Sequence, residues 1–299
     1  MKANRTPPNL WLTGGIFLIL IVSGGYYWRQ DQIDAGDSRV PPSKELEVQT
    51  PSLPALFSQD IPESCRQLLL VMSPHPTSIP ATLYLMERRD GGSPWEPVSE
   101  RGVIPVTLWR SGLAWGVGEH HATRPVEFRE KREGDGCSPA GVFRVPFTFG
   151  IDSVAEAHAE SPGLKLPYTA LEDSIIGVDD PKSKYYNQVV NSTTVTRDWD
   201  SHEPMNRYKR LYRWGAFIAH NPEGVPGFGS CIFIHVWPGP GEPTAGCTGM
   251  ADPDVVRVLT WLDPSKEPRL VQWVETVDSL SHEGSAATPT TVPGSSPGT

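Results

Sequence analysis

The chain has 299 residues, with 31 prolines, 28 glycines and a formal net charge of −9 at neutral pH. This length allows one well-buried domain of roughly 215 residues, and the proline and glycine content favours a loop-rich, mainly β fold. The acidic balance argues against nucleic acid as a partner, because binding to phosphates needs a basic face. No Gly-rich phosphate-binding loop occurs, so no nucleotide cofactor is expected.

An apolar stretch covers residues 10–28, after Lys2 and Arg5. At ~1.5 Å per helical residue it reaches roughly 28 Å, about the hydrocarbon thickness of a bilayer. Basic residues before it and acidic residues after it predict that residues 1–9 stay in the cytoplasm and that the rest is exported. Two interpretations stay open. The aromatic cluster 26–28 favours an uncleaved anchor in the inner membrane, whereas a cleaved signal peptide lacks a clear Ala-x-Ala site.

Residues 29–64 are expected to form a proline-rich linker, because they show neither helical nor alternating periodicity. A globular catalytic domain is predicted over residues 65–280. Residues 281–299 are mostly small and polar, a composition that predicts a disordered tail. The domain opens with apolar or alternating runs typical of a β-meander. These runs cover residues 68–72, 81–87, 95–98 and 103–109.

The middle of the domain mixes turns, a strand and a short helix. Residues 133–136 form a turn by composition, and a strand is predicted over residues 142–149. Residues 153–157 predict a short helix. Asp179 and Asp180 are interpreted as a turn, because no histidine or third acid stands at metal-ligand spacing. No His-x-x-x-His or Cys-x-x-Cys pattern occurs in the chain, so no metal site is predicted.

A strand, a loop and a cysteine on a glycine turn make residues 230–250 the most informative segment. Residues 231–237 are typical of a buried strand, and alternation puts Cys231 and His235 on one face. The Pro/Gly run 238–241 ends this strand, and the chain returns to Cys247.

Cys247 and His235 have the chemistry of a nucleophile and its base. A thiol attacks a carbonyl when a base favours the thiolate and N–H donors hold the oxyanion. His235 can supply the base, and the backbone N–H groups of Ala245, Gly246 and Cys247 can supply the oxyanion hole. A single buried cysteine or histidine more often only packs in the core. The presence of both residues on one strand–loop unit favours a catalytic role. We expect the pKa of the Cys247 thiol to lie well below the usual value of ~8.5, so that the thiolate forms readily.

Alternatives to this pair come from neighbouring segments. Cys231 is the rival thiol, because it shares a face with His235. A strand is predicted over residues 214–220, next to the His235 strand, because the connection between them is short. This arrangement brings His220, the rival base, and Asn221 to one rim of the site as candidate substrate-binding residues.

The four cysteines allow two disulfides in an exported protein. If Cys247 is the nucleophile, at most one bridge remains among Cys65, Cys137 and Cys231, and its pairing is left open.

The end of the domain reads as a helix and a strand. Asp252 is the predicted N-cap, followed by Pro253 at the first helical position. The helix is expected to end near residue 263, and a last strand is predicted over residues 269–274.

Three ordered blocks resemble the L,D-transpeptidase catalytic domain family, whose members remodel bacterial peptidoglycan. His235 precedes Thr-Ala-Gly-Cys at residues 244–247, where the family has Ser/Thr-His-Gly-Cys. Residues 131–143 are similar to the family's Lys-x-Gly-Asp-x-x-Thr-Pro-x-Gly run, and residues 179–205 resemble one branch. Ala245 replaces the second histidine, as in the branch with an Ala-Gly-Cys variant. Gly249 stands where many members carry Arg or Asn.

The resemblance implies a mainly β, sandwich- or barrel-like catalytic domain with a few short helices, and no cofactor. It implies that Cys247 attacks a peptidoglycan tetrapeptide stem, with His235 as base, and that the thioester passes to a second stem. Residues 207–213 form a basic run that contains Arg207, Arg210 and Arg213. With no arginine at position 249, one of these arginines, with Arg213 as the first choice, is the candidate to hold the substrate's carboxylate. Hydrolysis by an L,D-carboxypeptidase or amidase, a non-catalytic peptidoglycan-binding module, and an amidase or protease of unrelated fold are the alternatives. The sequence sets no oligomeric state.

Overall fold

The computed structural model describes residues 51–98 and 102–275. All of these residues belong to one structural unit, Gln49–Thr299. The predicted cytoplasmic stub, membrane segment and C-terminal tail lie outside the described residues. Within the described ranges, no helix has the length and apolar character needed to cross a membrane.

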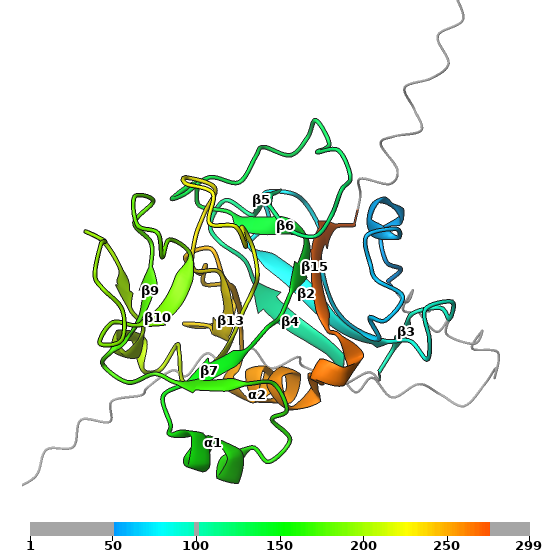
Figure 1. Cartoon of the computed structure of the whole chain (residues 1–299). Coiled ribbons are helices and arrows are strands. Elements are labelled where there is room, and N and C mark those ends of the chain that lie inside the picture. The colour runs from blue at the N-terminus through cyan, green and yellow to red at the C-terminus, as the bar shows by residue number, and fades with distance from the viewer. Residues whose placement is uncertain (1–50, 99–101, 276–299) are drawn as a thin grey trace, which may run out of the picture. The chain divides into compact units, whose positions relative to one another are not determined.

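The strands of the described part of the chain form two sheets (Figure 1). Twelve strands form the larger sheet, in the order β5-β6-β15-β1-β2-β4-β14-β13-β12-β7-β8, with β3 paired to β2. Its strands are β1 (Gln67–Ser73), β2 (Pro80–Glu87), β3 (Glu96–Pro97), β4 (Val103–Thr107), β5 (Leu113–Trp115), β6 (Ser138–Arg144), β7 (Thr148–Gly150), β8 (Tyr168–Ala170), β12 (Trp214–Phe217), β13 (Phe233–Val236), β14 (Thr248–Met250) and β15 (Arg269–Val274). The smaller sheet consists of β10 (Gln188–Asn191), β9 (Ile175–Val178) and β11 (Glu203–Pro204). The predicted mainly β fold is confirmed.

The helices are short and lie outside the sheets. They are α1 (Val154–Glu160), α2 (Asp252–Trp261) and the 3-10 helices η1 (Ala55–Phe57), η3 (Met205–Tyr208) and η4 (Pro264–Lys266). The side chain of Ser153 accepts from Glu156 N and the side chain of Glu156 accepts from Ser153 N, a capping box that fixes the start of α1. The N-cap of α2 is Ala251, so the predicted cap Asp252 is instead the first helical residue, where its charge favours the helix dipole.

The predicted meander is present, and β2 is its centre, because it pairs with β1, β3 and β4. β1 lies between β15, which runs parallel, and β2, which runs antiparallel, and all seven of its residues are buried. A continuous apolar run is the pattern expected of a strand that is covered on both faces. β2 pairs with β4, and β4 pairs with β14, the strand that directly follows Cys247.

The prediction of one strand over residues 142–149 is wrong, because this segment is divided between β6 and β7. β6 pairs with β15 and β5, whereas β7 pairs with β12 and β8, at the other end of the sheet order. The break falls at Pro146, which has no N–H to donate to a ladder. The strand predicted over residues 231–237 also shortens to β13. Cys231 has φ +54°, a left-handed conformation that cannot extend the strand.

Part of the predicted linker packs into the domain. Phe57, in η1, is fully buried and has its ring centroid 5.1 Å from that of Trp273 and 6.0 Å from that of Trp115. The ordered domain therefore begins before residue 65. The four cysteines are all free, so no bridge joins Cys65, Cys137 or Cys231.

Candidate active site

The strand register brings Cys247 and His235 to the same face of the sheet. β13 runs parallel to β14, with Ile234 opposite Thr248 and His235 opposite Gly249. Cys247 directly precedes β14 and lies beside Phe233, whose N–H donates to its sulfur at 3.3 Å. Residues at alternate positions share a face, so Cys247 and His235 are diagonal neighbours on adjacent strands. Among the described residues, the Cys247 sulfur is hydrogen-bonded to the N–H of Phe233 and the carbonyl oxygen of Cys231, and no hydrogen bond joins it to the His235 ring.

The imidazole of His235 is held in one tautomer. Its Nδ1 lies 2.7 Å from the carbonyl oxygen of Val236, which can only accept, so Nδ1 carries the proton. Nε2 is then left with its lone pair. Burial lowers the pKa of His235 to about 4, although the bond to Val236 acts in the opposite direction. At neutral pH the ring is therefore uncharged and can take a proton at Nε2.

The thiol of Cys247 is protonated at rest. Burial raises its pKa well above the usual range, and the negative charge of Glu203 adds to the effect. The N–H of Phe233 and the ammonium of Lys131 act in the opposite direction without cancelling it. The expected low-pKa thiolate is wrong for the resting protein, because the residue is only 4% exposed and water cannot stabilise the anion.

The loop before Cys247 is fixed by its own residues. Gly246 has φ +121°, and a Cβ there would lie 3.1 Å from Cδ1 of Ile232, so a glycine is required. The hydroxyl of Thr244 donates to the carbonyl oxygen of Cys247 at 2.5 Å. In the described part of the chain, the N–H groups of Gly246 and Cys247 donate no hydrogen bond outside the strand ladders.

Gly249 has no room for the arginine found in many relatives of the resembled family. A Cβ at this position would lie 2.8 Å from Cγ2 of Thr244 and 3.0 Å from Cβ of Trp237. The first contact is closer than real Cβ atoms come, and the second is tight enough that Trp237 would have to shift. The glycine is therefore part of how this loop packs, and a carboxylate-binding group must come from elsewhere.

A pocket of about 270 Å³ opens beside the imidazole. Its wall residues are Glu203, Tyr208, Leu211, Tyr212, His235, Pro238, Pro243, Thr244 and Ala245. The Tyr212 hydroxyl donates to Oε1 of Glu203 at 2.5 Å, and the Tyr212 ring meets the His235 ring edge-on, with centroids 5.2 Å apart. Ala245 and His235 thus face open space while Cys247, two residues beyond Ala245, stays buried.

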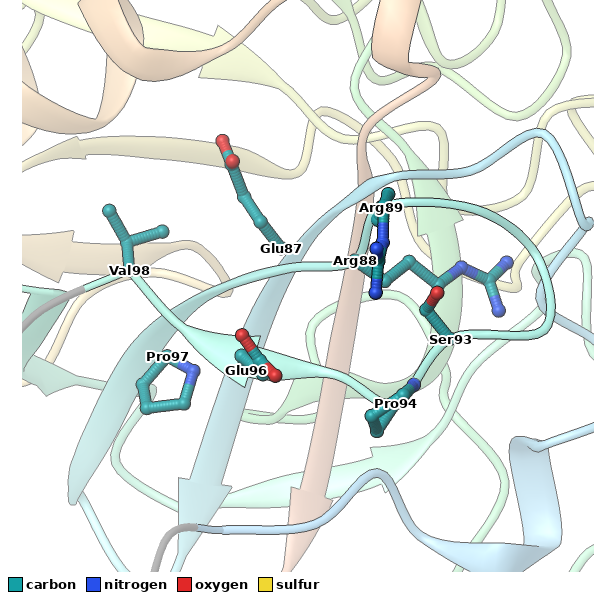
Figure 2. Close-up of a pocket in the computed structure, with 8 residues that line it drawn as sticks. All are labelled: Glu87, Arg88, Arg89, Ser93, Pro94, Glu96, Pro97 and Val98. Atoms are coloured by element: carbon teal, nitrogen blue, oxygen red, sulfur yellow. The ribbon is translucent and has the colours of Figure 1, made fainter.

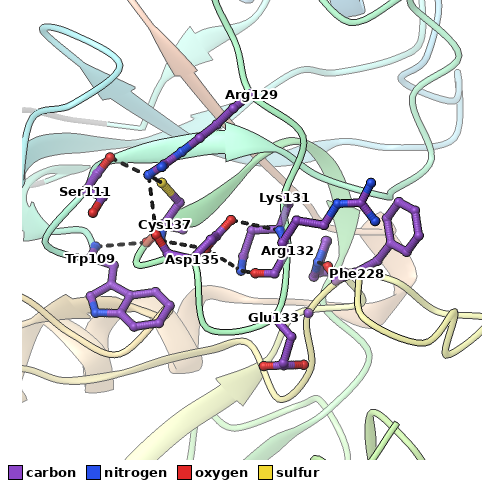
Figure 3. Close-up of polar contacts among 12 residues, drawn as sticks. Trp109, Ser111, Arg129, Lys131, Arg132, Glu133, Asp135, Cys137 and Phe228 are labelled. Atoms are coloured by element: carbon purple, nitrogen blue, oxygen red, sulfur yellow. Dashed lines mark hydrogen bonds and ion pairs between the residues drawn. The ribbon is translucent and has the colours of Figure 1, made fainter.

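A buried ion pair supports the site from the segment 131–143. Lys131 is 2% exposed and its Nζ lies 2.9 Å from Oδ1 of Asp135, which also accepts from the N–H of Cys137 (Figure 3). The pair keeps a positive charge close enough to favour the Cys247 thiolate, although burial outweighs it. The spacing that suggested the family resemblance therefore corresponds to a folded loop closed by its own lysine and aspartate.

The rival thiol and the rival base serve the structure. The sulfur of Cys231 packs against Gly177, where a Cβ would come within 2.8 Å of it, and burial raises its pKa well above the usual range. Both nitrogens of His220 contact backbone: Nε2 lies 2.9 Å from Phe228 O, and Nδ1 accepts from Val117 N. Burial lowers the pKa of His220 to about 4. Neither residue lines the pocket.

The predicted substrate-binding residues are used elsewhere in the fold. Asn221, with φ +50°, donates to the carbonyl oxygens of Val225 and Gly229, and so shapes its own loop. Arg213 forms ion pairs with Glu160 at 2.6 Å and Asp252 at 3.2 Å. Another arginine of the same basic run lies nearer the pocket.

That arginine is Arg210, which donates to the carbonyl oxygens of Trp237 and Pro238 at 3.5 and 3.1 Å. Pro238 is part of the pocket wall, so Arg210 is placed at the rim. It is a better-placed candidate than Arg213 for a substrate carboxylate.

A larger hollow of about 490 Å³ lies beside the β2–β3 hairpin (Figure 2). Its wall contains Arg88, Arg89 and Glu96, without a thiol or an imidazole. We regard the smaller pocket as the functional one, because only that pocket contains the candidate base. Among the described residues, no group of three or more His, Cys, Asp or Glu side chains is arranged to hold a metal ion.

No protein-family model, curated protein or solved structure matches the chain. The sequence reasoning proposed Cys247 and His235 but did not anticipate the contact of Glu203 with Tyr212. The two residues lie nine positions apart across β11, η3 and a turn, and no periodic pattern marks their contact.

Proposed function

We propose that this protein is a cysteine acyltransferase, an L,D-transpeptidase that acts on peptidoglycan stem peptides. The observation that carries the proposal is the β13–β14 register, which puts residues 235 and 247 on one face, together with the bond from Nδ1 of His235 to Val236, which leaves Nε2 its lone pair. The pocket at His235 supplies space for a peptide. The substrate class comes from the resemblance of the three sequence blocks.

In the proposed reaction, the sulfur of Cys247 attacks the carbonyl carbon of the third stem residue while its proton passes to Nε2 of His235. The intermediate loses the terminal D-Ala, whose amine takes the proton from His235, and a thioester remains. An amine of a second stem then takes the acyl group, or water does, which gives L,D-carboxypeptidase cleavage. The N–H groups of Gly246 and Cys247 are the proposed oxyanion donors, and losing one such donor costs about 3–4 kcal/mol of barrier.

The test uses the full chain and isolated disaccharide-tetrapeptide, with products identified by mass spectrometry. The proposal expects loss of D-Ala together with a cross-linked dimer or a tripeptide. Cys247→Ala protein should yield neither. Intact substrate after prolonged incubation with folded wild-type protein would contradict the proposal.

A non-catalytic peptidoglycan-binding module is the second candidate function. The observation that favours it is the resting state of the site, with a protonated thiol and an uncharged imidazole, both buried. Such a module should bind the tetrapeptide and release it unchanged. Export and attachment to the inner membrane through residues 10–28 remain part of the proposal for either function.

A further inference from the structure

Two residues of the pocket wall have no task in the acyl transfer described above. Glu203 comes from β11, where it pairs with Gly177 of β9, and Tyr212 precedes β12. The hydroxyl of Tyr212 donates a hydrogen bond to Oε1 of Glu203, and the Tyr212 ring contacts the His235 ring. Tyr212 thus connects a carboxyl group directly to the candidate base, inside the same pocket.

The negative charge at this place has no cation to balance it. Among the described residues, no lysine, arginine or histidine forms an ion pair with Glu203. Burial raises the pKa of Glu203, and the nearby Asp179 raises it further, against the hydrogen bond from Tyr212. Oδ1 of Asp179 is itself buried and has no hydrogen-bond partner among the described residues. Glu203 is half-buried, and a partly desolvated carboxylate without a cation partner favours a cationic ligand.

We propose that Glu203, held in position by Tyr212, binds the primary ammonium group of the acyl acceptor and takes its proton as the acceptor attacks the thioester. This inference rests on the proposed function and names its acceptor class: an amine, in preference to water. A carboxyl has two oxygens and Tyr212 uses one, so the other is left for the ligand.

The proton balance of the second step follows from this placement. The bound ammonium gives one proton to the Glu203 carboxylate, and the neutral amine attacks the thioester carbon. The nitrogen's second proton passes to Nε2 of His235, the carbon–sulfur bond breaks, and the departing sulfur of Cys247 takes that proton. An amide and a free thiol result, and Glu203 later releases its proton to water.

The experiment separates the two steps in the full chain. Wild-type and Glu203→Gln proteins are given disaccharide-tetrapeptide, and the acyl-enzyme and the ratio of cross-linked dimer to tripeptide are measured by mass spectrometry. We expect Glu203→Gln still to form the acyl-enzyme, at a rate changed by the lower pKa of its Cys247 thiol, while the dimer-to-tripeptide ratio, which is set after acylation, falls by about 100-fold. Tyr212→Phe should lower the ratio less, in the same direction.

The matched control is Glu133→Gln. Glu133 also accepts from a tyrosine hydroxyl at 2.5 Å, that of Tyr186, but it does not line the pocket. The control should keep the wild-type ratio. An unchanged ratio in acylated Glu203→Gln protein, or an equal fall in Glu133→Gln, would overturn the inference and leave the proposed function standing.

Two further outcomes keep the test decisive. If wild-type protein forms no acyl-enzyme, the proposed function itself fails. If Glu203→Gln does not fold, Glu203→Asp withdraws the carboxylate from the pocket while it keeps the charge. The ratio is then expected to fall by about tenfold or more, and an unchanged ratio would again overturn the inference.

Discussion

The hydroxyl of Ser138 donates to the carbonyl oxygen of Cys247 at 3.2 Å, although the two residues are 109 positions apart in the sequence. The same Ser138 oxygen accepts from the N–H of Trp109 at 3.1 Å. Two of the blocks that resemble the transpeptidase family therefore meet at the cysteine. Thr244 contacts the same carbonyl oxygen, so the main chain at the thiol is held from two sides.

Ser138→Ala should weaken this support. Trp109 N and Cys247 O each lose a partner in a buried region, and we expect unfolding free energy to fall by about 1–3 kcal/mol. Acylation of Cys247 should slow as well. Denaturant unfolding and acyl-enzyme formation check the two effects. Ser153→Ala is the control, because it removes the cap of α1, costs about 1 kcal/mol, and should leave acylation unchanged. Wild-type behaviour of Ser138→Ala in both assays would show that the contact is unimportant.

The two buried thiols should behave differently on substitution. Cys247→Ala removes the proposed nucleophile and should abolish turnover of the tetrapeptide. Cys231→Ala should keep most of it, because the Cys231 sulfur packs against Gly177 and lines no part of the pocket. Product formation by mass spectrometry is the measurement. Equal loss in both variants would indicate that the wrong thiol has been assigned.

Stability should decline as pH falls from about 6.5 to 4. Burial lowers the pKa of His220 and His235 to about 4 in the folded protein. The unfolded chain, with histidine pKa near ~6.5, binds more protons in this window, so acid favours unfolding. Each histidine adds a slope of about 1.4 kcal/mol per pH unit. Glu203, whose pKa is raised, acts in the opposite direction by a single proton.

Urea unfolding at pH 7 and pH 5 tests this dependence. The account expects a lower unfolding free energy at pH 5. The pKa of Asp263 lies at about 2, so the stability that this residue contributes is lost only below pH ~4. It does not affect the comparison between pH 7 and pH 5. A flat profile between pH 7 and 5 would mean that these histidines are not buried as uncharged rings.

Glu203→Gln should make the Cys247 thiol easier to ionise. The negative charge of Glu203 raises the pKa of Cys247, so its removal lowers that pKa toward the ordinary range. The pH profile of iodoacetamide alkylation at Cys247, followed by peptide mass mapping, should move to lower pH. Glu133→Gln is again the comparison, with the wild-type profile expected. A Glu203→Gln profile at higher pH than wild type would contradict the assigned electrostatics.

The sequence predicted those features that depend on short-range pattern. The apolar runs that became β1 and β2, and the short helix that became α1, were predicted from residue order, whereas the Ser153 cap was not. One strand and one short loop join His235 to Cys247, so their nearness in the fold was predictable, while their partnership in catalysis stays a prediction.

Features that depend on tertiary contact were not readable. Burial of Cys247 raises its pKa, contrary to the expectation, and this burial comes from a hydrophobic cluster that includes Met205, Tyr212 and Phe233. Pro146 was visible, yet the destination of β6 and β7 at opposite ends of the sheet order is set by β15 and β12. The Glu203–Tyr212 contact likewise appears only after folding.

Acylation by a carbapenem tests the central claim most directly. Full-length wild-type protein is incubated with the compound and its intact mass is measured, with peptide mapping to find the modified residue. The account predicts one adduct, on Cys247, in wild type and in Cys231→Ala, and none in Cys247→Ala. Folded wild-type protein that gains no mass, or that carries the adduct on another residue, would contradict the assignment of Cys247 as the nucleophile.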